Sequence, residues 1–314
     1  MPAGSRQPCL ACGSTDFREH RAREMQLGTR DEFTYTECVG CGSLALPDPP
    51  DLTPYYQHDD YVPGHAQDVS LPRLERLVKR AAFELGLRGV LRPRRWRTVR
   101  LAGIRQGDAI LDVGSGRGTF LRHLERNGFR NLTGIDPFVE PDNLIQRVAF
   151  EDYDGGPFDA IFFHEAFEHL ADPSATLRHA KAMLKPDGRI VISTPVADAY
   201  AWRTYGVDWF ALEAPRHLFI PTRKSMRLLA DAAGLTVSKL VDDSIVLQIW
   251  ASEQYRQDVP LNDPRTVEFE WSPRRKEWER LTRELNARGD GDHATFLLEY
   301  ASQPRRSGSI RGSS

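Results

Sequence analysis

A short apolar strand, a glycine-rich turn and the start of an amphipathic helix follow one another between residues 107 and 124, and this run constrains the fold most strongly. Glycines at 114, 116 and 118 let the backbone turn tightly and approach a ligand where a β-carbon would collide. A second strand over 132–135 leads into Asp136, whose carboxylate is placed to accept hydrogen bonds from ribose hydroxyls. The run predicts an α/β fold that binds a nucleoside.

The spacing of the glycines disfavours a dinucleotide. The dinucleotide fingerprint is Gly-x-Gly-x-x-Gly, whereas this chain has Thr119 at the last position and its third glycine one residue earlier. Asp112, inside the first strand, is also poorly suited to a pyrophosphate. Its charge suits a ligand that carries an ammonium and a sulfonium group.

Three ordered motifs resemble those of the class I S-adenosylmethionine (SAM) dependent methyltransferases. Asp112, Gly114 and Gly116 match the first motif directly. Residues 158–170 are similar to the family's fourth strand and following helix, and residues 184–195 resemble the lead into its fifth strand. The resemblance covers residues 105 to 240 approximately. It implies a Rossmann-like, seven-stranded, doubly wound α/β sheet with an antiparallel last strand.

The resemblance also implies a set of residues that bind SAM. They are Asp112, Gly114, Ser115, Gly116, Gly118, Asp136, Pro137, Phe163 and His164. The chemistry is the in-line displacement of an activated methyl group, so orientation can supply most of the catalysis. A hydroxyl acceptor still benefits from a base. The candidates are His217, His164 and Glu165, and His169 is expected to be a hydrogen-bonded packing residue.

His217 is the leading candidate for the base. Pro215 fixes the chain just before it, and Trp209 offers a flat apolar surface for a sugar face. The alternative is a structural histidine, which caps the helix expected from Thr222 or pairs with Glu213. Mutation of His217 separates the two interpretations.

All four cysteines lie in two Cys-x-x-Cys pairs near the start of the sequence. They are Cys9, Cys12, Cys38 and Cys41, and a glycine follows each pair. Four thiolates complete a tetrahedral structural zinc site. Redox pairs are the alternative, but a redox Cys-x-x-Cys normally occurs once, beside a βαβ unit. The pattern therefore predicts one zinc ion.

The sequence predicts that the protein consists of four parts. A zinc-binding module over 1–50 ends at a proline-rich linker, and a helical linker or lid region follows over 51–104. It contains an amphipathic helix expected over 71–90 and a basic segment over 92–100, interpreted as a solvated face or an anionic substrate handle. The methyltransferase domain spans 105–301 and a disordered tail 302–314. Strands are expected over 235–241, 245–249 and 293–299, with a charged helix over 271–286.

Composition and charge limit the kinds of binding partner and the cellular location that we expect. No apolar run approaches the ~20 residues that cross a bilayer, so no transmembrane segment is expected. The first residues lack the layout of a signal peptide, which predicts a cytoplasmic protein. Formal net charge is −2. The chain as a whole therefore has no electrostatic attraction to nucleic acid, which makes that partner the less favoured one.

The paired cysteines ahead of the catalytic domain resemble bacterial methyltransferases that act on sugars or other small metabolites. This likeness implies O-methylation of a sugar, a glycan precursor or another small-metabolite hydroxyl, including anionic acceptors. One alternative is an RNA methyltransferase that recognises its substrate through the zinc finger. Another is a noncatalytic SAM-fold adaptor, against which the intact Asp112, Gly114, Gly116 and Asp136 speak.

Overall fold

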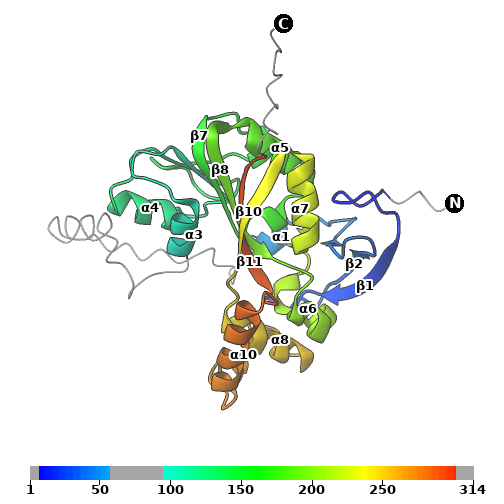
Figure 1. The fold of residues 1–314 in the computed structure, drawn as a ribbon. Coiled ribbons are helices and arrows are strands. Elements are labelled where there is room, and N and C mark those ends of the chain that lie inside the picture. The colour runs from blue at the N-terminus through cyan, green and yellow to red at the C-terminus, as the bar shows by residue number, and fades with distance from the viewer. Residues whose placement is uncertain (1–6, 57–94, 302–314) are drawn as a thin grey trace, which may run out of the picture.

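The computed structural model describes residues 7–56 and 95–301 (Figure 1). The helix expected over 71–90, the first part of the basic segment and the expected tail over 302–314 lie outside these residues. Among the described helices, none combines the length and apolar character needed to cross a bilayer.

A seven-stranded sheet forms the centre of the molecule, with strand order β10-β11-β8-β7-β4-β5-β6. Its strands are β4 (Ile110–Val113), β5 (Leu132–Ile135), β6 (Ile145–Gln146), β7 (Phe158–His164), β8 (Leu184–Pro195), β10 (Leu235–Asp242) and β11 (His293–Tyr300). Six strands run in the same direction, whereas β11 runs antiparallel to both of its neighbours, β8 and β10. The predicted Rossmann-like sheet with an antiparallel last strand is confirmed.

Helices cover both faces of this sheet (Figure 1). Helices α3 (Arg95–Ala102) and α4 (Thr119–Arg126) pack on one face, and α5 (Pro173–Ala182) and α7 (Arg223–Ala232) pack on the other. Side chains in β7 alternate between the two cores: Phe162 packs with α4, and Phe163 packs with α5. Because both faces are buried, the strand is a continuous apolar run rather than an alternating one.

A smaller antiparallel sheet joins the amino-terminal residues to the main domain. Its order is β1 (Phe17–Arg23), β2 (Glu32–Cys38), β3 (Leu44–Ala45) and β9 (Phe219–Ile220). Leu44 pairs with Ile220, and the Leu46 amide donates to the Leu218 carbonyl over 2.9 Å. Residues 7–50 therefore share a sheet with the segment that follows the fifth parallel strand. The domain boundary near residue 50 stays a prediction.

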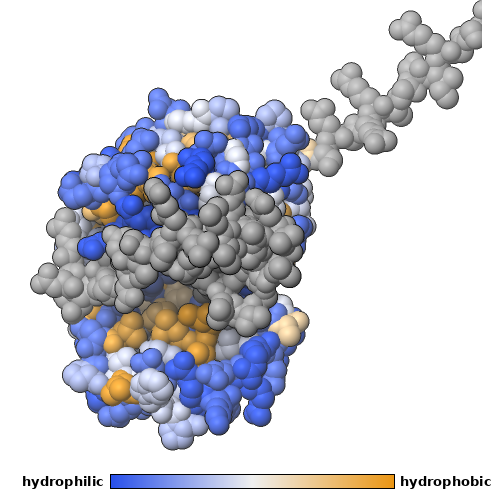
Figure 2. Space-filling model, turned by 90° about the vertical axis from the view of Figure 1, so that its left-hand side faces the viewer, coloured by the Kyte–Doolittle hydropathy of each residue, from blue (hydrophilic) through white to orange (hydrophobic). Residues whose placement is uncertain are grey.

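Helices and short turns fill the remaining chain. They are α1 (Thr53–Tyr56), α6 (Tyr200–Tyr205), α8 (Val246–Arg256), α9 (Thr266–Glu270), α10 (Arg275–Ala287), and the 3₁₀ turns η1 (Phe150–Asp152), η2 (Phe167–His169), η3 (Gly206–Asp208) and η4 (Phe210–Leu212). Trp209 and Tyr35 lie in a core that these helices share with the small sheet. Figure 2 shows a mainly hydrophilic face with its broadest apolar area below the middle and smaller apolar spots elsewhere.

Several expected elements agree with the structure and two do not. Strands over 235–241 and 293–299 and the charged helix of α10 are confirmed. The strand expected over 245–249 is wrong, because α8 starts at Val246 and the Gln248 side chain accepts the Ile245 amide at its start. A short apolar run fits either element. The helix after the fourth parallel strand begins only at Pro173, where Asp172 caps it, and η2 precedes it.

Candidate functional site

The glycine-rich loop lies at the carboxyl end of β4. Gly114 and Gly116 have φ values of 66° and 54°, a region that favours glycine. A β-carbon on Gly114 would lie 2.8 Å from that of Ala166, whereas one on Gly116 would meet nothing within 4 Å. Gly118 precedes α4 with a φ of 72°, and the Ser115 amide donates to the Ile135 carbonyl over 3.1 Å. The loop is thus tied to β5 and leaves open space above Gly116.

Asp136 lies directly beside this loop. One carboxylate oxygen accepts the Gly116 amide over 2.9 Å, and the other accepts the Phe138 amide over 2.9 Å. The side chain is largely buried, and Pro137 after it is exposed. Each oxygen keeps a further lone pair, so the carboxylate can also accept hydroxyl donors.

His164 ends β7 and contacts Asp112 from the neighbouring strand. Its Nδ1 is 3.3 Å from Asp112 Oδ1, and its Nε2 is 3.0 Å from the Thr98 hydroxyl. The ring is buried between Phe120 and Phe162. Both of its nitrogens therefore already have partners inside the protein. Phe163 is also fully buried, so only its backbone can face a ligand.

Glu165 follows β7 with a φ of 53° and points its carboxylate at His293. The Glu165 Oε1 to His293 Nε2 distance is 2.6 Å, and His293 Nδ1 is 2.6 Å from Asp243 Oδ1. His293 and Asp243 are buried, whereas half of the Glu165 side chain is exposed. A non-glycine residue at positive φ is strained, and such residues cluster at functional sites. Sequence reasoning missed His293 and Asp243.

His217 lies in the buried segment before β9. Its Nδ1 is 2.8 Å from the Ala211 carbonyl, and its Nε2 is 3.5 Å from Glu213 Oε2. The Tyr35 hydroxyl donates to its backbone carbonyl over 2.9 Å. Burial lowers the pKa of His217 below its ordinary value, although Glu213 opposes this shift. The helix after it is capped by Thr222 and not by His217, and the His217 ring lies beside the Glu213 carboxylate.

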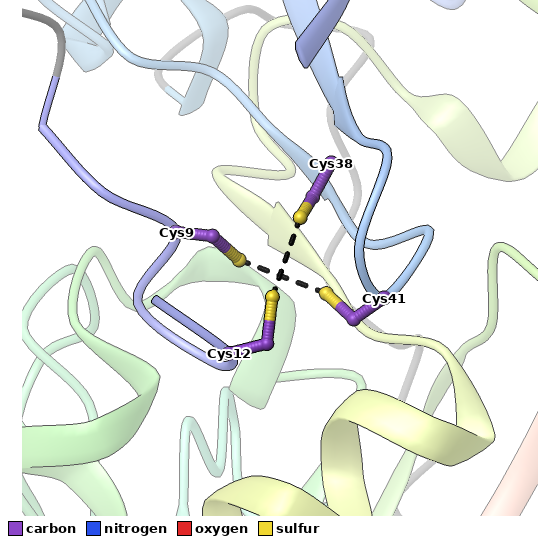
Figure 3. A group of neighbouring side chains, drawn as sticks. All are labelled: Cys9, Cys12, Cys38 and Cys41. Carbon is purple, nitrogen blue, oxygen red and sulfur yellow. Dashed lines mark hydrogen bonds between the residues drawn. The ribbon is translucent and has the colours of Figure 1, made fainter. Parts of the chain in front are cut away.

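The four cysteine sulfurs converge on one point between two turns of the chain (Figure 3). Cys9 Sγ is 3.6 Å from Cys41 Sγ, and Cys12 Sγ is 3.5 Å from Cys38 Sγ. A disulfide requires about 2.05 Å, whereas zinc–sulfur bonds of about 2.3 Å place tetrahedral sulfurs about 3.8 Å apart. The hydrogen bond between Cys9 and Cys41 lowers the pKa of the Cys9 thiol and raises that of the Cys41 thiol. The cluster fits a tetrahedral metal ion.

Comparisons with known proteins agree with this geometry. A model of the methyltransferase domain matches residues 88–240. The ubiquinone biosynthesis O-methyltransferase of Actinobacillus pleuropneumoniae is 30% identical over 160 residues, which are 43% of this chain and 68% of that protein. The same-named protein of Xanthomonas oryzae pv. oryzae is 32% identical over 129 residues, 35% of this chain and 53% of that protein.

A third relative has a different name. The tRNA U34 carboxymethyltransferase of Aeromonas salmonicida is 26% identical over 181 residues, which are 50% of this chain and 52% of that protein. The chain spans about half the length of this relative and of the Xanthomonas protein. The seven-stranded sheet and the position of the glycine loop define a Rossmann-like α/β domain. With these matches, the chain belongs to the class I SAM-dependent methyltransferase family.

Proposed function

We propose that the protein transfers a methyl group from SAM to a hydroxyl of a small metabolite, such as a sugar or a glycan precursor. The observation that carries this proposal is the placement of the open Gly116 loop, Asp136 and the half-exposed Glu165 at one edge of the sheet. Ligands of open α/β sheets bind at this edge.

The residues present fit SAM. Open space lies beside Gly116, and a side chain at this position would occupy part of it. The Asp136 carboxylate accepts the Gly116 amide at the border of this space. Asp136 would accept the ribose hydroxyls, and the loop backbone at Gly114 and Ser115 would face the rest of the ligand. Asp112 is buried in β4, two residues before Gly114, and its negative charge favours a cationic ligand. When bound, SAM supplies a methyl group whose carbon–sulfur bond breaks as the acceptor oxygen attacks, with the electron pair left on sulfur.

Of the three candidate bases, Glu165 has the geometry to take the acceptor proton. His164 already contacts Asp112 and Thr98, and His217 is buried with its Nδ1 at a backbone carbonyl. Glu165 is half exposed, and the β-carbon of the next residue, Ala166, lies against Gly114, so Glu165 directly precedes a residue that contacts the cofactor loop. The proton leaving the acceptor hydroxyl would be held on this carboxylate beside His293. General bases of this kind contribute roughly 10²- to 10⁴-fold.

A hydroxyl acceptor is supported by the two relatives named as O-methyltransferases. An RNA acceptor is the second candidate, because another relative is named as a tRNA carboxymethyltransferase. We also propose that the cysteine cluster holds one structural zinc ion, since its four thiols leave no open ligand position for substrate. Such an ion would fix the turn that packs beside β9.

Calorimetry with S-adenosylhomocysteine and NAD tests the cofactor. We expect the first to bind in the low micromolar range, roughly 8 kcal/mol, and NAD not to bind. Asp136→Ala should weaken binding by about 1–3 kcal/mol for each ribose hydrogen bond lost. Binding of NAD instead would overturn the cofactor assignment.

Radiolabelled methyl transfer tests the acceptor and the base. Sugars, phenols and unmodified tRNA are offered in parallel, and label on tRNA alone would replace the small-molecule proposal by the RNA one. Glu165→Gln should lower turnover by about 100-fold with cofactor affinity retained. The matched control is Glu284→Gln on the exposed side of α10. Equal turnover in both variants would remove Glu165 from the proton path.

A further inference from the structure

A second cluster of possible metal ligands lies between η2 and the segment before β9. Its members are Glu168, His169 and His217, and one ligand atom from each lies within 4.8 Å of the others. His217 Nε2 is 3.9 Å from Glu168 Oε1, and the two imidazole centres are 4.8 Å apart. Glu168 and His217 are buried and His169 is partly so. The cluster shares no residue with the cysteine site.

Backbone contacts fix the protons on both imidazoles. His169 Nδ1 is 2.9 Å from the Arg216 carbonyl and 3.0 Å from the Tyr56 hydroxyl, which can also accept, and His217 Nδ1 is 2.8 Å from the Ala211 carbonyl. A carbonyl oxygen can only accept, so each Nδ1 carries a hydrogen and donates it. Each neutral ring therefore has its lone pair on Nε2. Carbonyl contacts of this kind orient the histidine ligands of metal sites.

The Glu168 carboxylate is the least satisfied group in the cluster. Its side chain has no exposed area, and its Oε2 accepts the Thr194 hydroxyl over 2.9 Å. Among the residues that the structure describes, its Oε1 has no hydrogen-bond partner. A buried carboxylate oxygen without a partner is strongly destabilising. This oxygen faces the His217 ring, whose Nε2 is also an acceptor.

A buried ion pair between Arg216 and Glu213 flanks His217 in the chain. Arg216 is fully buried and its Nε donates to Glu213 Oε1 over 2.9 Å, so these two charges compensate each other. Glu213 Oε2 adds a further acceptor 3.5 Å from His217 Nε2. The cluster thus brings carboxylate oxygens of Glu168 and Glu213 beside the His217 Nε2 lone pair, with the His169 ring packed next to them. Such an arrangement is complementary to a positive ion.

We propose that Glu168 Oε1, His169 Nε2 and His217 Nε2 bind one divalent transition-metal ion, of the zinc or iron(II) type. Two imidazoles and one carboxylate are a ligand set that these ions take in proteins. Bonds of about 2.0–2.2 Å place ligand atoms about 3–3.6 Å apart. The 3.9 Å pair would close by a few tenths of an ångström, and a pair at the 4.8 Å limit of the cluster would close by about 1–2 Å. The ion would link η2 to the segment before β9.

Cobalt(II) titration of the full-length, metal-stripped and reduced protein tests this site. Thiolate ligands give cobalt intense sulfur-to-metal charge-transfer absorption, whereas imidazole and carboxylate ligands give only weak visible bands. We expect two cobalt ions per chain, one with each spectrum. A thiol-blocking reagent should release the first ion and leave the second bound.

Variants identify the ligands of the second ion. Glu168→Gln keeps the shape of the side chain and removes its charge, and we expect it to weaken the second site by more than the roughly 10- to 100-fold typical of outer-shell changes. The matched control is His179→Ala on α5, whose Nε2 lies 2.9 Å from the Tyr153 carbonyl. It should leave both cobalt ions bound. Circular dichroism of each variant verifies folding.

One result overturns the proposal without any variant. If the wild-type protein binds a single cobalt ion, with charge-transfer absorption, Glu168 carries a proton instead of a metal. Two ions whose weaker site is unaffected by Glu168→Gln would overturn the ligand assignment.

Discussion

Gly114→Ala should destabilise the protein far more than the same change two residues later. At Gly114 the φ of 66° disfavours a side chain, and the new β-carbon would lie 2.8 Å from that of Ala166. The backbone conformation costs about 1–2 kcal/mol and the overpacking about 1–3 kcal/mol. The free energy of unfolding should therefore fall by about 2–5 kcal/mol.

Gly116→Ala is the matched control because its φ is 54° and its β-carbon would meet nothing within 4 Å. Only the backbone contribution applies, so we expect a loss of about 1–2 kcal/mol. Urea unfolding, followed by tryptophan fluorescence, measures both variants. Calorimetry with S-adenosylhomocysteine should show weaker binding for Gly116→Ala, because its methyl group enters the space assigned to the ligand.

A compensating change separates the two contributions at Gly114. Ala166→Gly removes the atom in collision, so adding it to Gly114→Ala should recover the overpacking part, about 1–3 kcal/mol. Equal losses for the Gly114 and Gly116 variants, or no recovery in the double variant, would refute the packing argument. A loop that had moved away from β7 would give that result.

Three further changes probe other parts of the structure. Cys38→Ser should remove one zinc ion per chain, measured by elemental analysis, with cofactor affinity retained; unchanged zinc would contradict the cluster. Tyr35→Phe loses the hydroxyl that donates to His217 and should lower the unfolding free energy by about 0.5–1.5 kcal/mol in urea, and no loss would argue against this contact. Burial raises the pKa of Asp292, so the folded state holds its proton more tightly and stability falls as pH rises above 3.8. Asp292→Asn should therefore stabilise the protein more at about pH 8 than at about pH 3.5 in urea titrations, and a pH-independent effect would refute this.

Local patterns were sufficient to predict the parts of the fold made by neighbouring residues. The strand, glycine loop and helix around Gly114 follow from periodicity and turn chemistry within a few residues. The two cysteine pairs could be recognised in the same way, because the cysteines of each pair are only three residues apart. The 245–249 segment shows the limit, because a short apolar run is compatible with a strand until its packing partners are known.

The acceptor side of the candidate site depends on long-range order that the sequence does not display. Glu165 meets His293 only because β11 inserts antiparallel beside β8, which brings its first residue to the edge where the parallel strands end. Asp243 arrives there at the end of β10 in the same way. Motif reasoning reached Glu165 but treated residues 293–299 as a strand alone. The surroundings of His217 likewise come from Tyr35, which belongs to the small sheet.

The pairing of β3 with β9 sets an order of events during synthesis. The partner strand is made roughly 175 residues after β3, which at roughly 5–20 residues per second takes about 9–35 s. Throughout this interval the nascent hairpin carries an unpaired edge and an uncovered Leu44. Its cysteines have all been translated by then, so a bound metal would already hold the turns at Cys9–Cys12 and Cys38–Cys41 together before β9 arrives.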